Sequence, residues 1–402
     1  MKNKLLHTPE GVRDIYNGEC EKKLVLQSKL LHTLKSYGYH NIQTPTFEFF
    51  DIFGKEIGTT PSKELYKFFD REGNTLVLRP DITPSIARSV AKYFADEDMP
   101  IRLSYMGNTF INNHSYQGRL KECTQLGAEL IGDNTVDADA EILAMVISSL
   151  KAVGLKEFQI SIGHVDILAG LIAAAGLDEE QTERVRELIA NKNFFGVEEE
   201  IEQTDIPQPL KQLFGMLGMI YNQASDFAGA CALAEEYASD YPQILAALER
   251  LQAFDAVLQI YGVDDHVSYE LGMISNYSYY TGIIFAGYTF GSGEPIVKGG
   301  RYDKLLPYFG KDAASIGFAF TVDQLMSALS RQKIEIPVDY RNTLIVYEET
   351  VKKNAIEKAA ALRAAGNAVE LILRDPKKTD ADYQAYKERN QIADLIFMGE
   401  DR

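Results

Sequence analysis

The sequence of 402 residues contains no tryptophan and three cysteines, and its acidic residues outnumber its basic ones. Cys20, Cys123 and Cys231 lie far apart and are odd in number, which excludes a disulfide framework and the close cysteine pairs of a zinc site. With 41 Lys and Arg against 58 Asp and Glu, the net charge is −17. A partner held mainly through its phosphates is therefore not expected, because such binding needs clustered positive charge.

Long hydrophobic runs are missing as well. The N-terminus turns polar after Leu5 and Leu6, so it does not read as a signal peptide, and no apolar stretch approaches the ~18 residues that span a bilayer. Together with the free thiols, this predicts a cytoplasmic protein. Glycine-rich phosphate loops, a His-Glu-x-x-His motif and metal-like histidine spacing are also missing. We predict no cofactor and no metal site.

The sequence does contain alternating helix and strand patterns. Residues 101–110 and 122–131 predict an antiparallel strand pair around a polar loop at 112–118. Other ranges predict helices (20–38, 83–95 and 137–153) and strands (42–50, 65–69, 75–78, 158–163, 267–271, 279–288, 295–297 and the start of 315–329). Residues 166–260 are mostly helical by pattern. Their charged runs, such as 178–187, are typical of solvated helix faces, and we assign them no function.

The end of the chain has a different pattern. Strand and helix segments alternate in β-α-β-α-β order at 343–347, 351–365, 368–373, 380–391 and 394–398, which indicates a small α/β unit with a partly parallel sheet. The predicted fold class is therefore α+β. A body at 1–330 holds an antiparallel sheet with flanking helices and a helical insertion at about 166–260. A linker at 331–340 and a small α/β domain at 341–402 follow it.

Seven segments, in order, resemble the motifs of histidyl-tRNA synthetase, a class II aminoacyl-tRNA synthetase. They span residues 8–325, about four-fifths of the chain, and their shared order makes the resemblance specific. The resemblance implies the class II fold, with a truncated anticodon-binding-like domain at the C-terminus. The segments are Thr8–Asp14, Ile42–Glu48, Leu78–Thr83, Gly118–Glu129, Tyr279–Gly282, Gly299–Asp303 and Gly317–Phe320.

Three positions depart from the pattern of that family. The resemblance implies phosphate- or carboxylate-binding arginines where this sequence has Ile111, Ser275 and Gln324. Adenylation builds negative charge on the phosphates, and fixed cations stabilise that charge. Losing one such donor typically costs ~3–4 kcal/mol in the transition state. The sequence therefore predicts no catalytic residues, although Arg79, Arg119, Lys121 and Arg301 leave nucleotide binding open.

The amino-acid pocket of the family is retained. By resemblance, Asp81 and Thr83 bind the ammonium group of histidine, Gln125 reaches the ammonium or carboxylate, and Glu129 accepts a hydrogen bond from the imidazole. The ring would be walled by Tyr279, Tyr280 and Tyr302. A zwitterion with an imidazole needs such acceptors and hydroxyls. Its carboxylate lacks a cation, which a helix N-terminus or a backbone amide could replace.

The spacing of these residues gives two further indications that do not depend on the family resemblance. Gln125 and Glu129 lie four apart on a predicted strand and so on the same face, which favours a shared site. Tyr279 and Tyr280 adjoin on a predicted strand, so one is expected to face the core and the other the pocket. Arg301 and Asp303 fit a structural ion pair as well as they fit a ligand contact.

A synthetase body with a retained histidine pocket and missing phosphate arginines resembles the regulatory subunits of short-form ATP phosphoribosyltransferase. The resemblance implies a non-catalytic subunit for the first step of histidine biosynthesis and for feedback inhibition by histidine. It also implies a hetero-oligomer with the catalytic subunit, a homodimer core at Ile42–Phe49, and no tRNA partner. Two alternatives remain: an active histidyl-tRNA synthetase with relocated arginines, and an unrelated amino-acid-binding regulator on the same fold.

Overall fold

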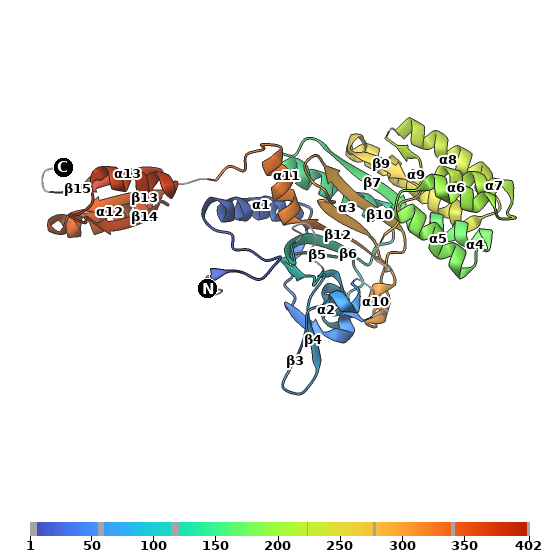
Figure 1. The fold of residues 1–402 in the computed structure, drawn as a ribbon, viewed down its shortest axis with the longest axis horizontal. Helices are drawn as coiled ribbons and strands as arrows, with labels where there is room; N and C mark the ends of the chain where they lie inside the picture. Colours follow the sequence, from blue (N-terminus) through green and yellow to red (C-terminus); the bar gives the residue numbers. More distant parts are fainter. Residues whose placement is uncertain are drawn as a thin grey trace. The chain divides into compact units, whose positions relative to one another are not determined.

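The structure is a computed structural model that describes residues 6–54, 60–113, 120–222, 224–275, 279–338 and 342–399 (Figure 1). The chain forms two compact units, each taken over its described residues. The larger comprises residues 1–13 and 26–335, and the smaller comprises residues 14–25 and 336–402. Within the described residues, no helix has both the length and the apolar character needed to cross a membrane.

The larger unit is built on a nine-stranded sheet with the order β1-β5-β6-β12-β11-β10-β7-β9-β8. β1 pairs with β5 and β7 with β9 in parallel, and the other neighbours are antiparallel. The α+β class with a largely antiparallel sheet is therefore confirmed. The strands are β1 His40–Asn41, β5 Ile101–Phe110, β6 Glu122–Ile131, β7 Phe158–His164, β8 Ile220–Tyr221, β9 Val267–Glu270, β10 Ile283–Thr289, β11 Val297–Arg301 and β12 Ser315–Thr321.

Helices flank this sheet. They are residues 26–36 of α1 Asn17–Ser36, together with α2 Thr83–Tyr93, α3 Val136–Ala152, α10 Leu305–Tyr308 and α11 Val322–Arg331. α3 is capped by the hydroxyl of Thr135, which accepts a hydrogen bond from the amide of Ala138. Almost every residue of α3 from Ala138 to Leu150 is buried, so this helix lies in the core rather than on the surface.

The predicted helical insertion is present between β7 and β9, with the short strand β8 inside it. Its helices are α4 Val165–Ala175, α5 Glu179–Ala190, α6 Phe194–Glu202, α7 Gln208–Met216, α8 Ala224–Ala238 and α9 Pro242–Tyr261. α9 packs against α3, α4 and α8 and buries Leu251, Phe254 and Leu258. α5 starts with a capping box between Asp178 and Gln181, which fixes where this charged helix begins.

A small antiparallel sheet lies outside the main one. Its order is β2-β4-β3, with β2 Phe47–Phe49, β4 Thr75–Leu78 and β3 Lys67–Phe69. The predicted hairpin between residues 65 and 78 is confirmed. The predicted strand at 42–50 is wrong in extent, since only His40–Asn41 and Phe47–Phe49 pair and Pro45 lies between them. Proline has no amide hydrogen to donate to a ladder.

The smaller unit contains the β-α-β-α-β order expected from the sequence. Its C-terminal part contains β13 Asn342–Tyr347, α12 Lys352–Ala364, β14 Ala368–Leu373, α13 Asp380–Arg389 and β15 Asp394–Met398. The sheet order is β14-β13-β15, and both pairings are parallel. Apolar side chains cover both faces of β13, with Leu344 and Val346 packing beside Tyr383 on one side and Ile345 packing beside Ala355 and Ala359 on the other.

Candidate functional site

Four of the predicted pocket residues meet around Glu129 on β6. The hydroxyl of Thr83 donates to Glu129 Oε1 at 2.8 Å, and the hydroxyl of Tyr302 donates to Oε2 at 2.6 Å. Asp81 lies beside them and accepts from the amide of Ile82 at 2.7 Å and from the hydroxyl of Tyr279 at 3.4 Å. Glu129 is 1% exposed, and the other four side chains are also buried. The expected grouping is therefore present, in a closed hydrogen-bonded network.

Glycine makes room for the Glu129 carboxylate. Glu129 on β6 pairs with Gly317 on β12. A Cβ atom at Gly317 would lie 1.6 Å from Glu129 Oε2, so any side chain there would displace the carboxylate. This explains why the Gly317–Phe320 segment begins with glycine. The segment belongs to the pocket wall, although its own side chains do not contribute polar groups to the pocket.

Thr83 is the first residue of α2, next to the N-cap residue Ile82, and no side chain caps this helix. The Thr83 hydroxyl instead donates to Glu129. The helix start therefore serves to position a hydroxyl in the pocket.

The cluster around Glu129 contains two buried acids, and no base in the described part of the chain pairs with them. Burial raises the pKa of Glu129 to about 8, the charge of Asp81 adds to this effect, and the hydrogen bonds from Tyr302 and Thr83 oppose it. Burial likewise raises the pKa of Asp81 above its usual range. Among the described residues, neither carboxyl forms an ion pair with Lys, Arg or His. The arrangement suits a ligand that brings its own positive charge or N–H donors.

Three tyrosines connect Glu129 with the surface. The ring centroids of Tyr302 and Tyr279 are 5.9 Å apart, and those of Tyr279 and Tyr280 are 4.9 Å apart. Tyr302 and Tyr279 are buried, and Tyr280 is half-buried. The prediction that Tyr279 and Tyr280 lie on a strand is wrong, because β10 begins at Ile283. Freed from strand alternation, the two rings pack edge to face on one side.

Gln125 lies on β6 four residues before Glu129, as predicted. It is half-buried, and its Oε1 atom is buried without a hydrogen-bond partner among the described residues. A buried acceptor without a donor costs roughly 1–3 kcal/mol. Gln125 is therefore a group that a bound ligand with N–H donors would satisfy.

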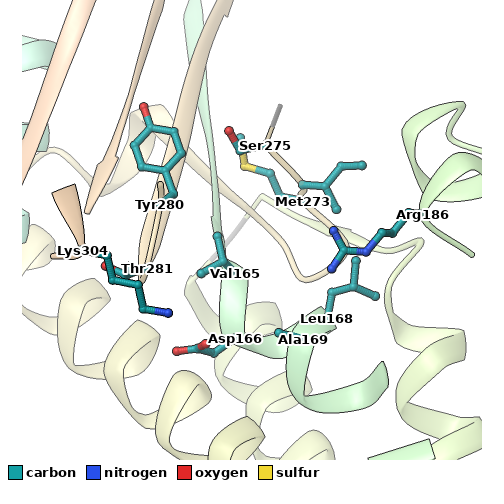
Figure 2. Close-up of a pocket in the computed structure, with 11 residues that line it drawn as sticks. Val165, Asp166, Leu168, Ala169, Arg186, Met273, Ser275, Tyr280, Thr281 and Lys304 are labelled. Carbon is teal, nitrogen blue, oxygen red and sulfur yellow. The ribbon is translucent and has the colours of Figure 1, made fainter. Parts of the chain in front are cut away.

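A cleft of about 550 Å³ adjoins the tyrosines, between the start of α4, α5 and the segments around Met273 and Thr281 (Figure 2). Ser275 and Tyr280 both line it. Its polar side chains include two cations, Arg186 and Lys304, and one carboxylate, Asp166. The apolar part of the lining is Val165, Leu168, Ala169, Met273 and Ile274.

The sequence did not point to Arg186 and Lys304. Arg186 lies in the charged run at 178–187, to which we assigned no function. Lys304 directly follows the segment Gly299–Asp303, which gave the only available signal.

Arg301 belongs to a second buried cluster, and its role there is structural. Its guanidinium donates to Asp139 Oδ1 at 2.5 Å and to the carbonyl of Asp133 at 3.1 Å. Asp139 also accepts from Arg250 at 2.6 Å. Asp303 is engaged by Arg301 at 3.3 Å and by the hydroxyl of Thr281 at 3.0 Å. Of the two alternatives left open, the structure shows the ion pair.

The positions expected to hold phosphate arginines lie elsewhere on the larger unit. Ile111 directly follows β5 and Gln324 is in the first turn of α11, both half-buried. Arg79 is buried and donates to the carbonyls of Thr44 and Asn108, so it belongs to the framework. Arg119 and residues 276–278 lie outside the described residues. In the described ranges, no three His, Cys, Asp or Glu side chains come together as a metal site.

The family profile of histidyl-tRNA synthetase matches residues 11–325. The ATP phosphoribosyltransferase regulatory subunit of Acetivibrio thermocellus is 40% identical over 383 residues, which covers 95% of this chain and 90% of that protein.

Solved structures of related proteins superpose on this chain over nearly its whole length. A Bacillus halodurans protein described as an ATP phosphoribosyltransferase regulatory subunit/histidyl-tRNA synthetase superposes with a TM-score of 0.84 at 32% identity, covering 99% of this chain and 100% of that one. Histidyl-tRNA synthetase of Nostoc sp. PCC 7120 superposes with a TM-score of 0.81 at 19% identity, covering 98% and 92%, and so shares the fold. The chain therefore belongs to the family of ATP phosphoribosyltransferase regulatory subunits, built on the fold of the histidyl-tRNA synthetases.

Proposed function

We propose that this protein is the non-catalytic regulatory subunit of a short-form ATP phosphoribosyltransferase, required for the first step of histidine biosynthesis and for its feedback inhibition by histidine. The observation that carries the proposal is the buried pair of carboxyls, Glu129 and Asp81, without a paired cation among the described residues. Histidine supplies an ammonium group and an imidazole, the two groups that such a pocket lacks. The 40% identity to a regulatory subunit over nearly the whole chain supports the assignment.

Each pocket residue has a defined part in this proposal. Glu129 pairs with the imidazole, and Asp81 with Thr83 receives the ammonium group. Gln125 accepts from a ligand N–H through the Oε1 atom that has no partner in the described residues. The ring lies against a wall formed by Tyr279, Tyr280 and Tyr302.

Feedback inhibition follows by linkage. If histidine binds one arrangement of the complex more tightly than another, a coupling free energy of ~1–3 kcal/mol is enough to change the flux several-fold or more. The protein itself then needs no catalytic group and no cofactor. Its chemistry is binding, and the reaction takes place on the partner.

We further propose that two copies of this chain form the core of the hetero-oligomer. The β2-β4-β3 sheet exposes aromatic side chains: Phe47 is 52% exposed, Phe49 is 55% exposed and Phe69 is 72% exposed. An apolar face of this kind is typical of an interface. Phe69→Ser together with Phe47→Ser is expected to yield monomers in sedimentation, whereas a dimer that persists in this variant would exclude the surface.

We also propose that the protein is cytoplasmic, that it binds no tRNA, and that it divides into a body at 1–330, a linker at 331–340 and a domain at 341–402. The net charge of −17 argues against tRNA. The smaller unit with β13, β14 and β15 is then free to contact protein. Binding of tRNA at physiological salt would contradict this part.

The deciding experiment mixes the purified protein with a short-form catalytic subunit and measures phosphoribosyl-ATP formation with and without histidine. Activity that depends on this chain and falls when histidine is added supports the proposal. An activity of the catalytic subunit that this chain does not change would refute it.

The alternative of an active synthetase is tested separately. It predicts histidine-dependent exchange of pyrophosphate into ATP at a rate typical of a working ligase. The residues at the expected arginine positions, Ile111, Ser275 and Gln324, argue against it, because none carries a positive charge. The other alternative, an unrelated amino-acid-binding regulator on the same fold, gains support if the chain binds histidine but no catalytic subunit.

A further inference from the structure

The pocket around Glu129 accounts for the ring and the ammonium group of an amino acid, but not for its carboxylate. The side chains that hydrogen-bond Glu129 and Asp81 are hydroxyls, and neither carboxyl has a cation beside it among the described residues. Ser275 stands where the resemblance implies an arginine. A carboxylate placed beside two buried acids without a cation would be strongly disfavoured. A ligand that keeps its carboxylate must therefore place it elsewhere.

The row of tyrosines leads from Glu129 to the cleft. Tyr302 bonds Glu129, Tyr279 lies against Tyr302, and Tyr280 lies against Tyr279 and lines the cleft. Tyr280 packs closely over the backbone of Gly300, where a Cβ atom would lie 2.9 Å from its ring. This contact fixes the ring at the boundary between pocket and cleft.

The amides at the start of α4, which also face the cleft, are already used. The amide of Val165 donates to the carbonyl of Gly282 at 3.0 Å, and the amide of Asp166 donates to His164 Nδ1 at 3.2 Å. Burial keeps the pKa of His164 well below its usual range, so the imidazole stays neutral and continues to accept. The first turn of this helix therefore offers little to an anion.

The cleft does offer two cations. Neither Arg186 nor Lys304 forms an ion pair or side-chain hydrogen bond with any described residue. By contrast, Arg184 on the same helix as Arg186 is paired with both Glu180 and Glu200. The lining holds one carboxylate, Asp166, to which Gln243 donates at 3.1 Å. Two cations against one carboxylate leave the cleft net positive in a protein of charge −17.

We propose that Lys304 and Arg186 receive the α-carboxylate of the effector in this cleft and so take the place of the arginine missing at Ser275. The inference rests on the proposed function, because it takes the effector to be histidine. Figure 2 shows the two cations on opposite sides of the cleft, Lys304 on the side of Thr281 and Arg186 on the side of Leu168.

A carboxylate held between these cations connects two parts of the larger unit. Lys304 follows Asp303, which is fixed to Thr281 by two hydrogen bonds of 3.0 and 2.9 Å, so its backbone is anchored in the turn between β11 and α10. Arg186 belongs to α5 of the helical insertion. Occupancy of the cleft therefore favours one placement of the insertion over others, which is the kind of differential contact that a regulatory ligand requires.

The test compares histidine with histidinol, which carries an alcohol in place of the carboxylate. Calorimetric titration of the complex with its catalytic subunit measures Kd for both ligands. Wild type is expected to bind histidine at least tenfold more tightly than histidinol, because a hydrogen bond between charged groups is stronger than one to an alcohol. Lys304→Met and Arg186→Met are each expected to raise the Kd of histidine about tenfold and to leave the Kd of histidinol within about twofold.

Arg184→Met is the matched control, because it removes a cation from the same helix that is already paired. It is expected to leave both dissociation constants unchanged. Equal binding of histidine and histidinol by wild type would overturn the inference and leave the proposed function intact, as would an equal loss of both ligands in the cleft variants. No binding of histidine to wild type at all would instead refute the proposed function.

Discussion

The larger unit contains two buried polar clusters that differ in how their charge is balanced. Around Asp139, two arginines surround one carboxylate, with Arg301 2% exposed and Asp139 0% exposed. Around Glu129, two carboxyls and several hydroxyls share the space, and no cation among the described residues pairs with them. We call the first cluster complete, because its counter-charges lie within the protein, and the second incomplete, because no described residue supplies a counter-charge.

This difference separates structure from function more clearly than residue type does. Both clusters contain residues from segments that resemble synthetase motifs, and Arg301 and Tyr302 are neighbours in the sequence. Arg301 nevertheless points to Asp139, while Tyr302 points to Glu129. When one partner of a buried ion pair is removed, the other charge is left buried and unpaired, which destabilises the fold. A buried acid that keeps its proton at neutral pH is ready to exchange that proton for a cationic ligand.

The largest effect is expected from breaking the complete cluster. Arg301→Met leaves Asp139 with one of its two arginines and should lower the free energy of unfolding by about 3–5 kcal/mol. Denaturant titration measures the loss. Arg102→Met is the control, because its pair with Glu141 is partly exposed and should cost about 1 kcal/mol or less. Equal losses in the two variants would contradict the structural role of Arg301.

Breaking the incomplete cluster should affect ligand binding rather than folding. Glu129→Ala removes the partner of the imidazole and should raise the Kd of histidine on the order of 100-fold, which abolishes the inhibition while leaving assembly intact. Assays of product formation with increasing histidine and sedimentation of the complex measure the two properties. Glu157→Ala, at an exposed site just before β7, is the control and should behave like wild type. Unchanged inhibition in Glu129→Ala would show that the pocket is assigned wrongly.

Much of the fold could be predicted from the sequence because its strands carry clear local patterns. The limits of β5 and β6 were predicted to the residue, as were those of β14 and β15. The strand expected at 42–50 was wrong because Pro45 interrupts it. Tyr279 and Tyr280 were wrongly placed on a strand, since their aromatic character suggests β structure although their rings serve the pocket.

The candidate site was predicted through resemblance, and its missing parts show the limit of that route. The family motifs pointed to Glu129, Thr83 and Tyr302, which the structure brings into contact. No motif pointed to Arg186, because a cation in a charged surface helix looks the same in the sequence whether or not it faces a cleft. The distinction depends on whether a neighbouring carboxylate pairs with it, as Glu200 does with Arg184.

The proton on Glu129 gives a pH test of the incomplete cluster. Free Glu129, with a pKa of about 8, is protonated below that pH, and a free imidazole is neutral above about 6.5. If the bound pair shares one proton, binding takes up or releases none between these limits, and affinity is constant there. Above pH 8 the binding reaction must take up a proton, and below pH 6.5 it must release one. The affinity for histidine therefore falls by up to about tenfold for each pH unit above 8 or below 6.5.

Calorimetric titration of histidine from pH 6 to 9 measures this profile, with Glu129→Gln as the reference. Gln does not titrate, so the ratio of wild-type to variant affinity isolates Glu129 from the titration of the ligand amine. The ratio is expected to decline above pH 8. A ratio that rises up to about pH 8 and is level above it would mean that the ligand binds the ionised carboxylate without a shared proton, and the view of Glu129 as a proton-holding partner would be wrong.

The smallest effects are expected at Gln125, where two properties should change in opposite directions. Gln125→Leu removes a buried acceptor that has no partner among the described residues, so the ligand-free protein should gain up to about 1 kcal/mol in free energy of unfolding. The same change removes an acceptor for the ligand and should weaken histidine binding about three- to tenfold. Thermal unfolding with and without histidine measures both. A variant that merely packed worse would be less stable both with and without histidine. Higher stability without histidine, together with a smaller stabilisation by histidine, would identify Gln125 as a group whose role is to bind the ligand.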